Sequence, residues 1–397
     1  MTALLERRWR VMVALWLVLV SMSAYEIVPA SVLLLIIEDL SISASAASWL
    51  ISVQLLAMAL LAIPAGMILD QRDNRFISLV AVCALFGAAV WSWWAAVGGE
   101  YYSLLASRLF GGVAAVVLWT ASVNVVSGVF ADDRQATAVG FVSTAIPAGF
   151  VFGQLFGPQI ATAYGWEMTF PILAAPAVVM MAVFALDSRS VSPAATGRQA
   201  PVWSEFRTLF RNRNVLLVSV MGFLALSLSM FYNSWLPSFL VDQFGFSLAG
   251  SGMLAAIFPA IGIVARAASG PISFRLFGGR RQPVVVASFA VLLPTTVVIA
   301  YVGRGAILYV LLVLAGFFTQ FGIALMYTYV REFAAKNVVA TALAILNALG
   351  FFGAFTAPII AGVLIDQTDS YVAAFGYASA LALLGLALAL RTPEPVR

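Results

Sequence analysis

The chain has 397 residues, of which 63% are hydrophobic and 10% are charged, and its mean hydropathy is +1.02. Ordinary soluble proteins carry about 25% charged residues, so this composition excludes that class and predicts a polytopic membrane protein. A single cysteine, Cys83, and the absence of histidine exclude an internal disulfide, a clustered thiolate metal site and an imidazole proton relay. Any proton coupling must therefore use a carboxylate. We expect no metal and no other cofactor.

Long apolar runs predict twelve membrane-spanning helices, because each can cover the roughly 20 residues that a helix needs to cross a bilayer. Such runs do not fit the alternating strands of an outer-membrane barrel, and backbone groups in hydrocarbon must be satisfied internally. We therefore predict an all-α fold. The first run continues well past Val20, too far for the core of a cleavable signal peptide. The predicted spans are residues 11–37, 46–68, 76–97, 102–130, 135–163, 168–187, 214–241, 248–273, 283–303, 305–330, 338–365 and 371–391.

The basic residues predict the orientation of the chain. With the N-terminus inside, eighteen of the 21 Lys and Arg residues fall in cytoplasmic segments, and of the other three only Arg304 falls in an external turn. An even number of spans then places both termini in the cytoplasm. The basic pI marks this orientation and gives no reason to expect nucleic acid. We expect a prokaryotic plasma membrane, because a chain with twenty arginines and one lysine suggests a GC-rich genome.

The longest polar connection runs from Asp187 to Arg213 and predicts a division into two halves. Residues 1–187 would form an N-terminal six-helix bundle, 188–213 a cytoplasmic linker and 214–397 a C-terminal six-helix bundle. The segment VWSEFRTLFRNR in the linker fits either an amphipathic helix on the membrane surface or a solvated linker. An internal repeat supports the division, because GPISFRLFGGRR, from Gly270, follows GMILDQRDNR at half the chain length. Phe274 stands in the second copy where Asp70 stands in the first.

The segment GMILDQRDNR, between the second and third predicted spans, resembles a loop of the major facilitator superfamily. The resemblance consists of a glycine, an acid four residues later and then basic residues, although two positions, Gln71 and Asn74, depart from it. It implies two bundles that rock around a central site, with the acid near the positive N-terminal end of the eleventh span in one conformation. The residues that carry this predicted gate are Gly66, Asp70, Arg72 and Arg75.

Glu26 is the only one of the 17 acidic residues that lies deep in a predicted span. About 15 residues from the inner end, at 1.5 Å each, place it on the order of 20 Å into the membrane. A charge there costs about 2.5 to 3.5 kcal/mol unless it faces a cavity, is paired or is protonated. Burial favours the neutral form, which suits a group that gains and loses a proton during transport. The alternative is a structural ion pair, for which Arg108 is the obvious partner.

Arg108 lies in the fourth predicted span and is followed by Gly111 and Gly112. This pattern resembles the fourth helix of the superfamily, and the resemblance implies a role for Arg108 in proton coupling or substrate binding. Alternatively, the glycines serve only to let helices approach. Trp119 shares a helix face with Arg108, so it could line the same cavity.

Arg266 is the third charge inside a predicted span, roughly 10 Å from the inner end of its helix. Its side chain could snorkel to cytoplasmic water. Alternatively, because Glu26 neutralises only one arginine, the other guanidinium is a forked donor for a carboxylate or another small oxyanion. The stretch YNSWLPSFLVDQFGFSLAGSGMLAAIF, followed by Arg266 and Gly270, resembles anion-porter branches of the superfamily, including cyanate and nitrate transporters. Ala62 stands where nitrate porters have an arginine, which argues against nitrate itself.

The fifth predicted span carries glycines at every fourth position, followed by a proline, in GFVSTAIPAGFVFGQLFGPQIA. Small residues at this spacing let a neighbouring helix pack closely, and the proline permits a bend. The run also resembles a fifth-helix motif of antiporters, with Ala161 and Thr162 in place of its closing glycines. We assign Gly153, Gly157 and Pro158 to conformational gating.

Family architecture places the first, fourth, seventh and tenth spans around the central cavity, which adds Tyr232, Asn233, Gln320 and Tyr327 to the predicted substrate site. Each of them alone could equally make a packing hydrogen bond. The prediction is a monomeric, proton-coupled transporter of a small organic or inorganic anion. The alternative is a proton-coupled multidrug efflux antiporter. We expect no enzyme, because no nucleophile with a base, metal cluster or nucleotide loop is recognisable.

Overall fold

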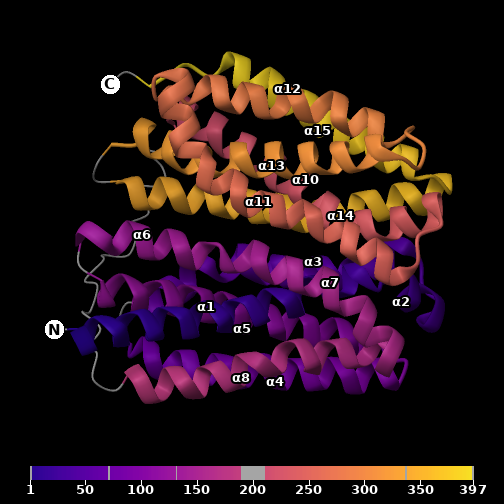
Figure 1. Cartoon of the computed structure of the whole chain (residues 1–397), viewed down its shortest axis with the longest axis horizontal. Helices are drawn as coiled ribbons and strands as arrows, with labels where there is room; N and C mark the ends of the chain where they lie inside the picture. Colours follow the sequence, from indigo (N-terminus) through magenta and orange to yellow (C-terminus); the bar gives the residue numbers. More distant parts are fainter. Residues whose placement is uncertain (1, 70–71, 131, 189–210, 336–337, 396–397) are drawn as a thin grey trace.

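The computed structural model describes residues 2–69, 72–130, 132–188, 211–335 and 338–395. Within these ranges the chain is helical and contains no strand, which confirms the predicted all-α fold (Figure 1). The helices of the N-terminal part are α1 (Thr2–Ser31), α2 (Leu33–Leu40), α3 (Ala44–Leu69), α4 (Asn74–Val97), α5 (Tyr101–Val129), α6 (Asp132–Ser143), α7 (Ala145–Tyr164), the 3-10 turn η1 (Trp166–Met168) and α8 (Thr169–Ser188). Those that follow are α10 (Arg213–Phe244), α11 (Leu248–Phe277), α12 (Gln282–Ile299), α13 (Ala306–Phe333), α14 (Val339–Thr368) and α15 (Tyr371–Arg391).

In the described ranges, twelve helical segments are long and apolar enough to cross a membrane, as predicted. Two predicted spans are each divided between two helices. The first breaks at Val32, three residues after Pro29, and the fifth breaks at Thr144, three residues before Pro147. A proline has no backbone N–H and its ring crowds the carbonyl four residues earlier, which explains the break before Pro147.

Helices α1–α8 pack mainly on one another, as do α10–α15, and Figure 1 shows the two groups as its lower and upper parts. The most extensive contacts between the groups are those of α3 with α14, α7 with α11 and α1 with α10. The two chain ends lie at the same end of the molecule, here called the termini end. The opposite end, where α3 begins and α14 finishes, is called the Asp366 end. Most of the predicted linker lies outside the described residues.

The glycines of α7 form a flat face against α1. A Cβ on Gly149 would overlap Ser23 and the Val20 carbonyl, and a Cβ on Gly153 would overlap Ile27 and the Ala24 carbonyl. Gly157 is equally close to Ser31 and Val28. These positions require glycine because no side chain fits between the two helices, so Gly153 and Gly157 pack inside the N-terminal group.

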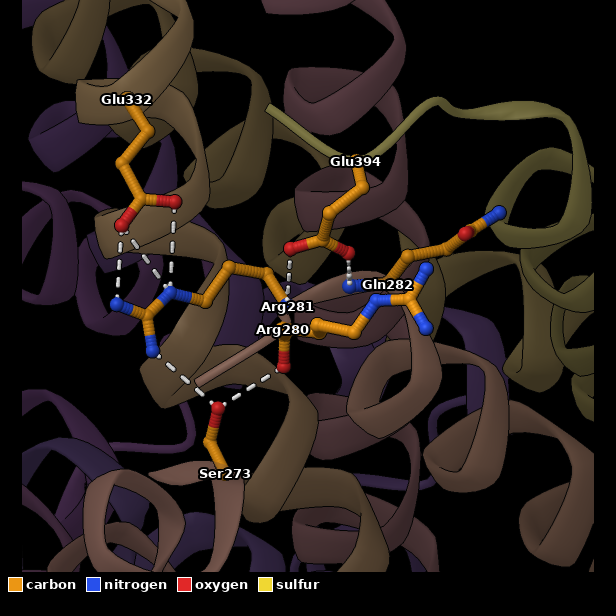
Figure 2. A network of polar contacts seen from close by, with 6 residues as sticks. All are labelled: Ser273, Arg280, Arg281, Gln282, Glu332 and Glu394. Atoms are coloured by element: carbon orange, nitrogen blue, oxygen red, sulfur yellow. Dashed lines mark hydrogen bonds and ion pairs between the residues drawn. The ribbon is translucent and has the colours of Figure 1, made fainter. Parts of the chain in front are cut away.

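A network of polar contacts closes the termini end of the second group (Figure 2). The Arg281 guanidinium pairs with Glu332 of α13 at 2.9 Å and donates to the Ser273 hydroxyl of α11 at 3.2 Å. Glu394, beyond α15, accepts from the backbone N–H groups of Arg281 and Gln282 at 2.6 and 2.9 Å. The segment after the last span therefore caps the first turn of α12.

Candidate functional site

Arg108 of α5 is completely buried and is held by main-chain carbonyls of two neighbouring helices. Its Nε donates to Leu50 O of α3 at 3.0 Å, and its Nη1 and Nη2 donate to Tyr25 O at 2.9 Å and Glu26 O at 2.5 Å in α1. The guanidinium also lies 4.6 Å from the centre of the Tyr25 ring. The sequence explains one acceptor, because Pro29 has no N–H to offer the Tyr25 carbonyl four residues earlier.

The carboxyl of Glu26 is buried, and within the described residues it makes no hydrogen bond and no ion pair. It lies within electrostatic reach of the Arg108 guanidinium. The predicted alternative of a side-chain ion pair with Arg108 is therefore wrong for this conformation, because Arg108 binds the Glu26 carbonyl instead. A buried carboxyl without a fixed partner remains available to exchange a proton.

Arg266 of α11 is half-buried and takes part in a chain of polar side chains inside the second group. Its Nε donates to Gln320 Oε1 of α13 at 2.8 Å, and Gln320 Nε2 donates to Ser229 Oγ of α10 at 2.9 Å. The two terminal nitrogens of Arg266 make no hydrogen bond or ion pair within the described residues. Because α11 continues to Phe277, Arg266 lies about 16 Å from the end of its helix, deeper than the sequence suggested.

Tyr327 extends this cluster towards α14. Its hydroxyl donates to Asn347 Oδ1 at 2.9 Å, 36% of the residue is exposed, and it lies within electrostatic reach of Arg266. Gln320 and Tyr327 are two turns apart on one face of α13, as predicted. Arg266, Gln320, Tyr327 and Asn347 thus form a partly exposed polar surface, here called the Arg266 cluster.

Asn233 of α10 lies where the two helix groups meet. Its carbonyl accepts from Gln154 Nε2 of α7 at 2.7 Å, and Pro237, four residues later, explains why this carbonyl lacks its usual helical donor. The Asn233 amide donates to Ser229 O at 2.7 Å. Asn233 therefore connects the second group to the first, and sequence reasoning had not assigned Gln154 to the site.

Two other predicted substrate residues lie away from the Arg266 cluster. Tyr232 is fully buried, stacks on Phe258 with ring centroids 5.0 Å apart, and shares a hydrogen bond of 2.8 Å with Thr296. Trp119 is half-buried against the core of the first group. Tyr232 is directed into the core, because its aromatic face and its hydroxyl both find partners there, and it is therefore not part of the proposed site.

The predicted gate at the termini end is described only in part, since Asp70 lies outside the described residues. Within them, Arg72 is exposed and Arg75 is half-buried, and neither forms an ion pair. A Cβ on Gly66 would meet no atom within 4 Å. Pro158 touches Gly252 of α11, so this member of the predicted gating set lies between the two groups.

A second contact between the groups lies at the Asp366 end and was missed from sequence. The Asp366 carboxylate of α14 accepts from the backbone N–H groups of Ala44 and Ser45, at the start of α3, at 2.8 and 2.9 Å. Gly362, one turn earlier, lies directly against the Ala44 carbonyl and Ser48. The sequence feature that could have revealed this contact is the pair Gly362 and Asp366, a glycine and an acid four residues apart near the end of a predicted span.

The fold and site define a polytopic helical membrane protein with isolated charges in its interior. The family model described as Major Facilitator Superfamily matches residues 12–306 and 278–397, so the chain belongs to that family, as predicted. It is 23% identical over 382 residues to a hexuronate transporter of Bacillus subtilis (strain 168), which covers 90% of this chain and 88% of the relative. It is 21% identical to a nitrite extrusion protein of the same organism, over 89% of this chain and 86% of the relative.

A solved structure with the same fold is that of a bacterial homologue of the human lysosomal transporter Spinster, in an inward-facing and unoccupied conformation. The TM-score is 0.83 at 16% identity, and the match covers 97% of each chain. Together these comparisons establish a multi-pass membrane protein of a secondary-transporter family, which acts on small solutes.

Proposed function

We propose that this protein transports a small organic anion, binds it at Arg266, and couples its movement to protons through Glu26. The half-buried Arg266 fork, with its terminal nitrogens unpaired in the described residues, is the observation that carries this proposal. A guanidinium presents parallel N–H donors that match the two oxygens of a carboxylate. The hexuronate and nitrite relatives support an anion as the solute.

The contacts of Arg266 support a binding role over simple snorkelling. One nitrogen is fixed by Gln320, which is itself fixed by Ser229, so the plane of the guanidinium is set by two neighbouring helices. A side chain that only reached for water would gain nothing from such a support. A fixed orientation lowers the entropy lost when an anion binds.

Proton coupling rests on Glu26 and Arg108. The carboxyl is buried without a fixed partner, and the arginine beside it is already bound to three carbonyls. Arg108 thus contributes its charge to the surroundings of Glu26 without needing the carboxylate as a hydrogen-bond acceptor. Protonation and deprotonation of Glu26 can then alternate while the helices around it stay joined.

For the membrane arrangement, we propose the plasma membrane with the termini end on the cytoplasmic side. The excess of basic residues in the segments at that end supports this orientation. Two six-helix bundles separated at residues 188–213 and acting as a monomer complete the proposal.

The test is uptake of a radiolabelled hexuronate into proteoliposomes with an imposed pH gradient. We expect Arg266→Ala to abolish uptake, and Arg275→Ala, an exposed arginine on the same helix, to leave it near the wild-type rate. Glu26→Gln should retain substrate exchange but lose the substrate-dependent pH change, whereas Glu100→Gln should keep both. Equal uptake by wild type and Arg266→Ala would refute the assigned site.

A further inference from the structure

We infer that Tyr327 and Asn347 are specificity-determining residues that recognise a hydroxyl group next to the carboxylate held by Arg266. The substrate is therefore a hydroxylated organic acid and not a simple inorganic oxyanion. This inference rests on the proposed function and narrows its substrate class.

The two residues lie beside the arginine on neighbouring helices. Tyr327 of α13 donates its hydroxyl proton to Asn347 Oδ1 of α14 at 2.9 Å and lies within electrostatic reach of Arg266. Both Tyr327, which is 36% exposed, and the half-buried Asn347 can be reached from outside the core. Tyr327 lies two helical turns from Gln320, the hydrogen-bond partner of Arg266, on the same face of α13, so one extended ligand can reach both the Arg266 fork and this pair.

The hydrogen bond between the pair determines what each residue still offers. Asn347 Oδ1 is occupied by the tyrosine proton, so the Asn347 amide keeps two N–H donors and the Tyr327 oxygen keeps its acceptor lone pairs. Within the described residues, neither group makes another hydrogen bond. The pair thus presents a donor and an acceptor next to each other.

A hydroxyl group matches this arrangement, since it donates one proton and accepts others. It can donate to the Tyr327 oxygen and accept from the Asn347 amide while the carboxylate of the same molecule binds Arg266. Nitrite and nitrate have acceptors only, so they would fill the arginine fork and leave the tyrosine oxygen without a donor. Polar groups left unpaired on binding cost affinity.

Neighbouring helices hold the Arg266 cluster in place, and this makes the recognition of a hydroxylated acid selective. Gln320, which is itself bound to Ser229, holds one side of Arg266, and Gln320 shares its helix face with Tyr327. The distance between the carboxylate site and the hydroxyl site is therefore set by α11, α13 and α14 and not by loops. If the hydrogen bond between Tyr327 and Asn347 served only to join α13 to α14, it would not distinguish one anion from another.

The experiment is calorimetric binding of three probes to the purified full-length chain: gluconate, hexanoate and nitrite. Gluconate and hexanoate are six-carbon acids that differ in their hydroxyl groups alone. The variants are Tyr327→Phe, Asn347→Leu and the milder Asn347→Ser. Tyr309→Phe, at an exposed position of α13, and Thr356→Val, at a half-buried position of α14, are the matched controls.

We expect wild type to bind gluconate at least about tenfold more tightly than hexanoate or nitrite. Each variant should weaken gluconate binding about 3- to 10-fold and leave hexanoate binding unchanged, as the loss of one hydrogen bond predicts. The controls should match wild type. Equal losses for both acids, or equal wild-type affinities for all three probes, would overturn the inference while leaving an anion site intact. Binding of no probe by folded wild type would refute the proposed function itself.

Discussion

Arg108 shows how one residue can be both structural and electrostatic. Its guanidinium donates to three carbonyl oxygens. One of them, that of Tyr25, lacks a helical donor because Pro29 has no N–H. Lysine would keep the positive charge near Glu26, but its compact ammonium does not reproduce a planar fork to three carbonyls. The two roles can therefore be separated by a single substitution.

We predict that Arg108→Lys lowers stability by about 1 to 3 kcal/mol, because at least one buried carbonyl loses its donor. The loss should appear as a lower unfolding temperature in detergent, measured by size-exclusion chromatography after heating. Substrate-dependent proton movement should persist in the fraction that remains folded. Arg275→Lys is the control, and an unchanged unfolding temperature in Arg108→Lys would contradict the assignment.

At the scale of the helix, close contacts between the two groups depend on glycine. A Cβ on Gly252 of α11 would overlap the Gln154 carbonyl and the ring of Pro158. Pro158 has no N–H for the Gln154 carbonyl four residues earlier, so this carbonyl is free to face the neighbouring helix. Sequence alone places the proline, but only the fold shows that α11 lies against it.

We predict that Gly252→Ala separates α7 from α11 and slows transport at least about tenfold, because backbone atoms on the opposite helix cannot move aside as a flexible side chain would. Gly376→Ala on α15, where a Cβ meets no atom within 4 Å, is the matched control and should transport normally. Initial uptake rates in proteoliposomes at equal protein density give the comparison. A normal rate for Gly252→Ala would show that this contact is not needed.

At the scale of the molecule, α3 and α14 are joined through Asp366. A carboxylate at a helix N-terminus binds unpaired N–H groups and the positive end of the helix dipole, which is worth about 0.3 to 1 kcal/mol at an exposed site. The contact predicted for Asp70, which follows α3 in the sequence, would place an acid at the start of α14, at the opposite end. Each helix would then cap the other in turn as the molecule alternates.

We predict that Asp366→Asn shifts the population towards conformations open at the Asp366 end, because the amide accepts more weakly and carries no charge. Spin labels are attached at Glu100→Cys and Gly303→Cys in a Cys83→Ser background. The distribution of distances between the two labels should contain a larger fraction of long distances in Asp366→Asn. Asp369→Asn, three residues later, is the control. An unchanged distance distribution would contradict a latch at Asp366.

The fold could be predicted because it follows from composition and from uninterrupted apolar runs, and the family from a short motif around Gly66. The site was less predictable. Glu26, Arg108 and Arg266 stand out because charges are rare in membrane spans. Whether a polar residue belongs to the site depends on the direction of its side chain around the helix, which the sequence does not give. Tyr232 turned into the core because Phe258 and Thr296 offer it partners there, whereas Gln154 and Asp366 became visible only when helices distant in sequence met.

The cap that Glu394 places on α12 is made by a residue that is synthesised after all the membrane-spanning helices. During translation the first turn of α12 therefore lacks this cap until Glu394 has been added and has left the ribosome. A premature stop codon just after Arg391 would leave the twelve described spans intact and remove this cap.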